Sequence, residues 1–222
     1  MNIYLIGAGD ISALAADAAE RFPESAVWAA KALPKGIEFT DNHIVQPVYL
    51  LPGIKYEQLL REALAYSGGV TLGEPLLRDE AAVNRLAGIL SAEYGNQNAL
   101  FVGHGTNHSS GRLYRELGEA LRRESGGRFF LSVLDEDFTA AREWIAENKI
   151  DKTLLVPLMI SMGRHAENEI IGRGGESIRS RLEAAGVETV CVAKGLIDYP
   201  AVREVFIDNI ASQLKSALLA DF

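Results

Sequence analysis

An uncharged apolar run from Leu154 to Ile160 constrains the fold of this chain more than any other segment. A continuous run of this kind is typical of a strand that is covered on both faces, as in parallel sheets flanked by helices. The run is followed by Gly163 and then by His165, at the start of a segment with helical character. Ligands of open α/β sheets bind at the carboxyl ends of the strands, so His165 is placed where chemistry is expected. Taken alone, a helix start whose polar residues face water is the better explanation.

A second apolar strand ends in the same way. Residues 98–102 run into Gly103-His104-Gly105, and a further imidazole follows at His108. Glycines on both sides of a histidine let the backbone turn tightly and leave the ring uncovered. Two histidines that end two strands of one sheet can share one crevice, so the two motifs together predict a site more strongly than either does alone.

Strand and helix patterns alternate along the chain, most plainly in its second half, and such alternation predicts an α/β fold with parallel sheets flanked by helices. Asp79 is the expected N-cap of a helix that reaches Tyr94. The polar link 95–98 is the predicted boundary between two lobes, residues 1–95 and 96–222.

Three segments carry a resemblance to a known family: Val-Gln-Pro-Val-Tyr-Leu-Leu-Pro-Gly-Ile-Lys-Tyr (45–56), Gly-His-Gly-Thr-Asn-His (103–108) and the segment 156–169 around His165. In combination they resemble the anaerobic sirohydrochlorin cobaltochelatases, class II chelatases related to ferrochelatase. The resemblance extends from about Ile44 to the C-terminus. It implies a chelatase-like fold of two lobes with the active cleft between them.

The same resemblance implies a lyase that inserts a divalent metal into a sirohydrochlorin-class tetrapyrrole without ATP. Co²⁺ is the first choice of metal, with Fe²⁺ and Ni²⁺ as alternatives, and no cofactor is expected beyond this substrate metal. In that family the histidines matching His104 and His165 bind the metal and act on the pyrrole N–H groups. His108 is expected one helical turn beyond His104, along the cleft, whereas His43 is expected at the opposite rim of a sheet.

The third metal ligand and catalytic carboxylate of the family is a glutamate, and its matching position here is Leu134. Asp135, Glu136 and Asp137 lie just beyond it. Side chains alternate between the two faces of a strand, so Glu136 is the candidate that would share a face with Leu134. An equally weighted explanation is that these acids cap the next helix, where negative charge is favourable.

A sirohydrochlorin-like tetrapyrrole is an apolar disc edged by carboxylates, so its cleft needs apolar walls and arginines at the edge. The candidate substrate-binding residues are Arg164, Arg173, Met162 and Tyr49. Tyr49 stands at a position that is often histidine in the family. An arginine of this kind is more often a solvated surface charge.

The first forty residues depart from the family pattern, and the first lobe is shortened. One alternative is therefore a catalytically impaired chelatase homologue that binds metal or tetrapyrrole. Another is a nucleotide-binding oxidoreductase, because Gly7-Ala8-Gly9 follows a short strand. That match is weak, since Ser12 replaces the third glycine of the motif and Lys31 occupies the region of its acidic ribose ligand.

Composition limits the remaining classes. The net charge of −8 argues against a general nucleic-acid binder, which needs a basic face. The single cysteine, Cys191, lies in an apolar run and is expected to be buried rather than reactive. No apolar run approaches transmembrane length and no signal peptide is evident, so we expect a cytoplasmic protein without a membrane partner. A homo-oligomer is compatible with the sequence.

Overall fold

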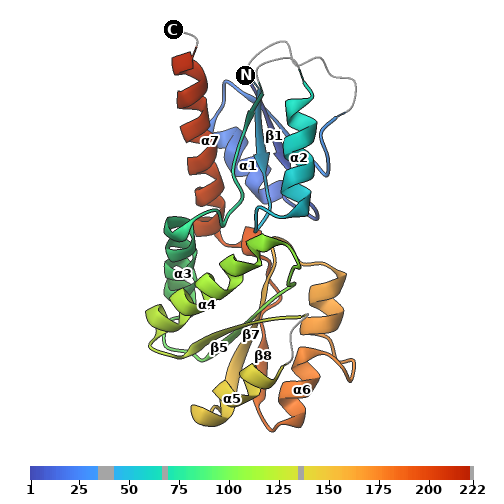
Figure 1. Cartoon of the computed structure of the whole chain (residues 1–222), viewed down its shortest axis with the longest axis vertical. Helices are drawn as coiled ribbons and strands as arrows, with labels where there is room; N and C mark the ends of the chain where they lie inside the picture. The colour runs from blue at the N-terminus through green and yellow to red at the C-terminus, as the bar shows by residue number, and fades with distance from the viewer. Residues whose placement is uncertain (35–42, 67–69, 135–137, 221–222) are drawn as a thin grey trace. The chain divides into compact units, whose positions relative to one another are not determined.

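The structure is a computed structural model, and it describes residues 1–34, 43–66, 70–134 and 138–220 of the 222. The chain forms two compact units, of which the first contains Met1–Arg78 and Ile197–Phe222 and the second contains Asp79–Leu196. Each unit has a four-stranded parallel sheet with helices on its faces (Figure 1). The predicted α/β class with two flanked parallel sheets is confirmed.

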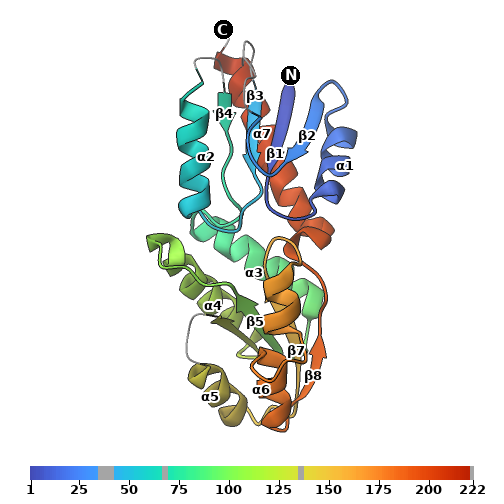
Figure 2. The same ribbon diagram turned by 90° about the vertical axis from the view of Figure 1, so that its right-hand side faces the viewer.

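The sheet of the first unit has the strand order β2-β1-β3-β4. Its elements along the chain are β1 (Asn2–Ile6), α1 (Ser12–Arg21), β2 (Ala26–Ala30), β3 (His43–Pro47), α2 (Ile54–Leu64), β4 (Val70–Leu72) and the late helix α7 (Pro200–Ala220). Helix α2 packs on one face through Leu59 and Ala63, which share a core with Tyr4 and Val45. Helices α1 and α7 pack against each other, and α7 also contacts β3 (Figure 2).

The sheet of the second unit has the order β6-β5-β7-β8. Its strands and longer helices are α3 (Glu80–Tyr94), β5 (Ala99–Gly103), α4 (Arg112–Ser125), β6 (Phe129–Val133), α5 (Thr139–Glu147), β7 (Lys152–Leu158), α6 (Ile178–Ala184) and β8 (Glu188–Cys191). A 3₁₀ turn (Ser109–Gly111) precedes α4, a π-helical turn (Ala166–Ile170) follows β7, and a further 3₁₀ turn (Leu196–Asp198) precedes α7.

Alternation of side chains along the buried strand β5 assigns its two faces to different helices. Leu100 and Val102 belong to the core that also contains Trp144 of α5 and Leu182 of α6. Phe101 points to the other face, where its ring makes an edge contact with Tyr94 of α3 at a centroid separation of 5.7 Å. The strand is therefore covered on both sides, as the parallel arrangement requires.

The two sheets share one topology, because each begins with its second strand from one edge and then builds outwards in both directions. In the second unit the chain leaves β5 towards β6 on one side, and it leaves β7 towards β8 on the other. Such a switch point opens a crevice at the carboxyl ends of the two central strands, which is where ligands of open α/β sheets bind. The crevice of the second sheet lies between the ends of β5 and β7.

The compact units differ from the predicted division at residue 95 in two helices. Helix α3 packs against α4 and so belongs to the second unit, and α7 returns to the first unit at the end of the chain. A helical pattern records that one face is apolar, but it does not record which sheet that face will cover.

Close packing explains why glycine occurs at Gly7, the first glycine of the weak dinucleotide match. A Cβ on Gly7 would lie 3.0 Å from Cβ and 3.1 Å from the carbonyl oxygen of Val48, so the chain after β1 passes close to the chain after β3. A side chain at this position would require the neighbouring segment to shift by a few tenths of an ångström, and glycine avoids that shift.

Candidate functional site

The first histidine motif is shaped by its glycines. A Cβ on Gly103, the last residue of β5, would lie 2.5 Å from Cε1 of Tyr114 in α4, so a larger residue would clash with that ring. Gly105 has a φ of +85°, a conformation that side chains rarely adopt. The backbone therefore leaves the strand in a tight turn, and His104 between the glycines is exposed.

The second histidine motif is held from behind by buried residues. His165 directly precedes the π-helical turn, in which Ala166 and Ile170 are fully buried in the core of the second unit. The loop after β7 is also supported by Gly195, where a Cβ would lie 2.6 Å from Cα of Ser161. His165 itself is exposed, so the structure holds its backbone and leaves its ring accessible.

The two predicted imidazoles meet. Strands β5 and β7 are neighbours, with Gly103 opposite Leu158, and the rings of His104 and His165 lie with their centroids 4.9 Å apart at an interplanar angle of 75°. A metal ion about 2.1 Å from one nitrogen of each ring, at a coordination angle between about 90° and 109°, would leave the centroids about 4.6–5.3 Å apart. The observed separation therefore fits a single ion shared by both rings.

Glu169 contacts one of these rings. Its Oε1 lies 2.5 Å from Nδ1 of His165, and both side chains are more than half exposed. Glu169 was not among the residues predicted from the sequence, although its four-residue spacing from His165 on a helical segment is a signal that could have identified it.

No third candidate ligand joins the two histidines within the part of the chain that the structure describes, where no group of three or more His, Cys, Asp or Glu side chains could hold an ion. The predicted ligand Glu136 lies outside the described residues, as does Asp135. The last described residue of this segment is Leu134, whose N–H donates to the carbonyl oxygen of Gly103 at 3.0 Å. Leu134 also lines a cavity of about 470 Å³ together with Glu169.

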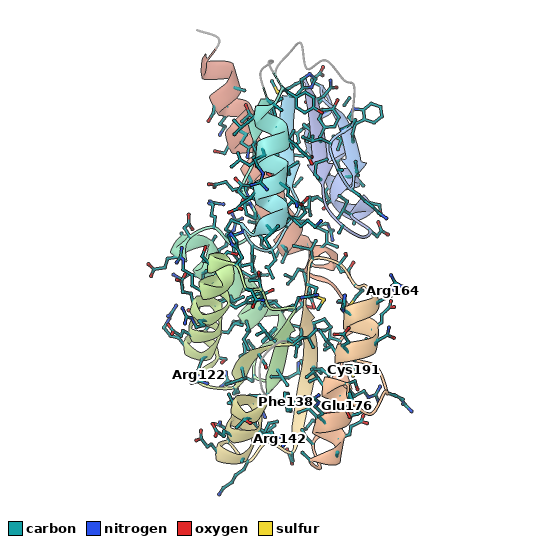
Figure 3. All side chains as sticks on the ribbon, turned by 45° about the vertical axis from the view of Figure 1, so that its right-hand side comes forward. Arg122, Phe138, Arg142, Arg164, Glu176 and Cys191 are labelled. Atoms are coloured by element: carbon teal, nitrogen blue, oxygen red, sulfur yellow. The ribbon has the colours of Figure 1, made fainter. Side chains whose placement is uncertain are left out.

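The candidate substrate-binding residues are distributed over both units. Arg164, which is labelled in Figure 3, is exposed and directly precedes His165 in the sequence, and Met162 is partly buried against the core of the second unit. Arg173 is exposed, and its positive charge acts on the thiol of Cys191. Tyr49 belongs to the first unit, where burial, and to a smaller extent the Glu62 carboxylate, raises the pKa of its phenol.

The expectation that His108 lies one helical turn beyond His104 is wrong, because the segment between the two residues is not helical. Its Nδ1 accepts a hydrogen bond from the Ser110 N–H at 3.2 Å, so His108 caps the 3₁₀ turn before α4. His108 also lines a cavity of about 540 Å³ beside α4 and β6. His43 lies at the amino end of β3, as predicted, and is buried against Tyr4.

Cys191 lies at the end of β8 and is partly buried against the core of the second unit. Burial raises the pKa of its thiol, an effect that the positive charges of Arg179 and Arg173 partly counteract. A thiol in this state is a poor nucleophile, because the thiolate is the reactive form.

Across the described ranges of the chain, no helix has the length and apolar character needed to cross a membrane.

Curated relatives of this chain carry names from one enzyme class. The chain is 27% identical to the sirohydrochlorin cobaltochelatase CbiKC of Nitratidesulfovibrio vulgaris over 78% of its length, and it spans 65% of the length of that relative. It is 25% identical to the sirohydrochlorin cobaltochelatase of Salmonella typhimurium, with 78% of this chain and 69% of the relative covered.

Solved structures agree in fold. SirB from Bacillus subtilis with Fe³⁺ superposes with a TM-score of 0.64 at 16% identity, covering 96% of this chain and 94% of SirB. CbiX, described as the terminal enzyme of siroheme biosynthesis in denitrifying bacteria, superposes with a TM-score of 0.62 at 18% identity, covering 95% and 97%. The chain thus has the two-lobed α/β fold of these chelatases.

A family model supplies the assignment. The model of the cobalt chelatase CbiK matches residues 35–215, which include both histidine motifs and most of the chain. The match begins after residue 34, in agreement with the expectation that the start of the chain departs from the family pattern. The chain therefore belongs to the CbiK family of cobalt chelatases.

Proposed function

We propose that this protein is a sirohydrochlorin cobaltochelatase, an enzyme that inserts a divalent metal, Co²⁺ foremost, into a sirohydrochlorin-class tetrapyrrole without ATP. The observation that carries the proposal is the pair of exposed imidazoles of His104 and His165, 4.9 Å apart at the ends of neighbouring strands. Membership of the CbiK family and the names of the curated relatives support the same reaction.

The metal is a substrate, and its site suits delivery. Neutral imidazole nitrogen is a good ligand for Co²⁺, Ni²⁺ and Fe²⁺. Two exposed imidazoles hold a cation less firmly than a closed set of three or four protein ligands would, and they leave coordination positions open. A loosely held ion can exchange protein nitrogen for the four nitrogens of the macrocycle.

The reaction also moves two protons. Insertion breaks two pyrrole N–H bonds and forms four metal–nitrogen bonds, so M²⁺ enters the macrocycle and two H⁺ leave it. Imidazole accepts protons near neutral pH, and a ring that has released the metal has a free lone pair. His104 and His165 are therefore the proposed metal ligands and also the proposed first proton acceptors.

The charged edge of the substrate needs cationic partners. Arg164 is exposed beside His165, and an arginine can bind a carboxylate through two parallel hydrogen bonds. We assign Arg164 and Arg173 to the propionate and acetate groups of the tetrapyrrole, and Met162 to its apolar face. Tyr49 remains a candidate contact from the first unit.

Removal of either ring tests the proposal. We expect His104→Ala and His165→Ala to lose Co²⁺ insertion into sirohydrochlorin, followed by absorbance, while circular dichroism stays unchanged because both side chains are exposed. Asn107→Ala is the matched control, since Asn107 is an exposed residue of the same loop. Insertion at the wild-type rate by either histidine variant would rule out that histidine as a ligand.

A catalytically impaired homologue is the second candidate, and it is favoured by Leu134, which stands at the position matching the glutamate of the family. Such a protein would bind Co²⁺ or the tetrapyrrole in titrations and yet not accelerate insertion over the reaction without protein.

A further inference from the structure

The contact between Glu169 and His165 determines which ring nitrogen can face a metal. An ionised carboxylate can only accept hydrogen bonds, so the hydrogen between Glu169 Oε1 and His165 Nδ1, 2.5 Å apart, must reside on Nδ1. A neutral imidazole carries one hydrogen, and its other nitrogen then bears the free lone pair. In this arrangement Nε2 is the nitrogen that is available to an ion.

The backbone holds the two side chains in register. Ala166 and Ile170, four residues apart, are fully buried on the inner side of the π-helical turn. His165 and Glu169 have the same spacing and are exposed on its outer side. Residues four apart on a helical segment are neighbours, so anchoring the inner pair also places the outer pair.

The end of the turn is closed just as tightly. A Cβ on Gly172 would lie 2.5 Å from the carbonyl oxygen of Asn168 and 2.7 Å from that of Glu167, so the chain folds back closely on the turn. The hydroxyl of Ser177 donates to the carbonyl oxygen of Gly172 at 2.7 Å. Glu169 is thus carried by a segment that is fixed at both ends.

We propose that Glu169 is a positioning residue that holds His165 as its Nδ1–H tautomer and directs Nε2 to the metal that His104 also binds. The proposal rests on the proposed chelatase function for the identity of the metal, but not for the tautomer itself. Histidines that bind metals commonly donate their second N–H to a carboxylate, which fixes the orientation of the ring and makes it a stronger ligand.

The contact between His165 and Glu169 contributes little to the folding stability of the protein. The side chain of His165 is 61% exposed and that of Glu169 is 51% exposed, and even ion pairs between side chains as exposed as these contribute little to folding, so a hydrogen bond of a neutral ring contributes no more. Orientation of an accessible ring is a role that an exposed carboxylate can perform.

The tautomer of His165 is measured directly by long-range ¹⁵N–¹H correlation in the metal-free protein. We expect the Nδ1–H form in the wild type, its loss in Glu169→Ala, and its retention in Glu169→Gln, whose amide oxygen can still accept from Nδ1. We expect Co²⁺ affinity, measured by calorimetry, to fall about 10–100-fold in Glu169→Ala and much less in Glu169→Gln. Glu167→Ala, an exposed glutamate in the same turn, is the control and should keep both properties.

Each alternative outcome is distinct. If Glu169→Ala keeps the wild-type tautomer and affinity, as Glu167→Ala should, the positioning role is excluded. If Glu169→Gln loses as much affinity as Glu169→Ala while the tautomer is unchanged, Glu169 is a direct metal ligand and the proposal fails. A wild-type protein that shows the expected tautomer and affinities but inserts no metal would overturn the proposed enzyme function and leave the role of Glu169 intact.

Discussion

Two imidazoles that bind one ion must be accessible to solvent and fixed in direction, and these demands are met by different residues. His104 and His165 provide accessibility, because both are exposed. Direction comes from their surroundings, namely Gly103 under the ring of Tyr114 and the buried side chains behind the π-helical turn. Accordingly, the two proposed ligands lie at the ends of strands, where a rigid sheet meets a short loop.

At the same scale, the candidate third ligand gives a prediction that concerns Glu136. We expect Glu136→Gln to weaken Co²⁺ binding about tenfold or more and to slow insertion, because a carboxylate beside two imidazoles holds the cation more firmly. Asp135→Asn should be close to neutral, since alternation along a continued strand would place Asp135 on the other face. Calorimetric titration of both variants with Co²⁺ checks this, and equal effects would indicate that neither residue is a specific ligand.

Among the helices and strands, replacement of glycine by alanine should have opposite effects on the free energy of unfolding at two positions of the second unit. Gly103 ends β5 against Tyr114, whereas Gly88 lies inside α3, where an added Cβ would meet no described atom within 4 Å. At Gly103, tertiary packing leaves no room for a larger side chain. At Gly88, a larger side chain has room, and glycine only lowers the stability of the helix through its low helix propensity.

We therefore expect Gly103→Ala to lower the free energy of unfolding by about 1–3 kcal/mol, because Tyr114 must move from its buried position. Gly88→Ala should raise it by up to about 1 kcal/mol through better helix propensity. Urea unfolding of both variants measures the difference. A Gly103→Ala variant as stable as the wild type would show that α4 yields easily and does not fix the turn at His104.

In the complete fold, the C-terminal helix α7 packs with the N-terminal part of the chain. Helix α7 lies in the first unit, where Arg203 Nε lies 2.6 Å from Asp17 Oδ2 in α1 and Phe206 is fully buried. Chain order and spatial order therefore disagree, and the second unit is inserted between two parts of the first.

A pair of core substitutions tests this division. We expect Phe206→Ala to cost about 3–5 kcal/mol and to speed amide hydrogen exchange in β1, β3 and α1, while exchange in β5 and β7 stays slow. Leu182→Ala, in the core of the second unit, should cost about 2–5 kcal/mol and do the reverse. If each variant accelerates exchange equally in both sheets, the two units unfold as one cooperative body.

Features that follow from local chemistry, or from the general geometry of parallel sheets, could be predicted from the amino-acid sequence. The apolar runs identified β5 and β7, Asp79 was predicted as a cap and its Oδ1 does accept from the Ala82 N–H at 2.8 Å, and the histidines at two strand ends identified the pair that meets. The first two follow from periodicity and from capping preference, which act within a few residues, and the third follows from the geometry of parallel strands, whose carboxyl ends meet at one edge of a sheet.

Features that depend on contacts between residues far apart in the sequence could not be predicted, because they are set by the tertiary structure. The close approach of Tyr114 to Gly103 and the return of α7 to the first sheet join residues that no local pattern relates. An apolar helix face or a polar side chain can be satisfied by several partners, and only the packing of the folded chain selects among them.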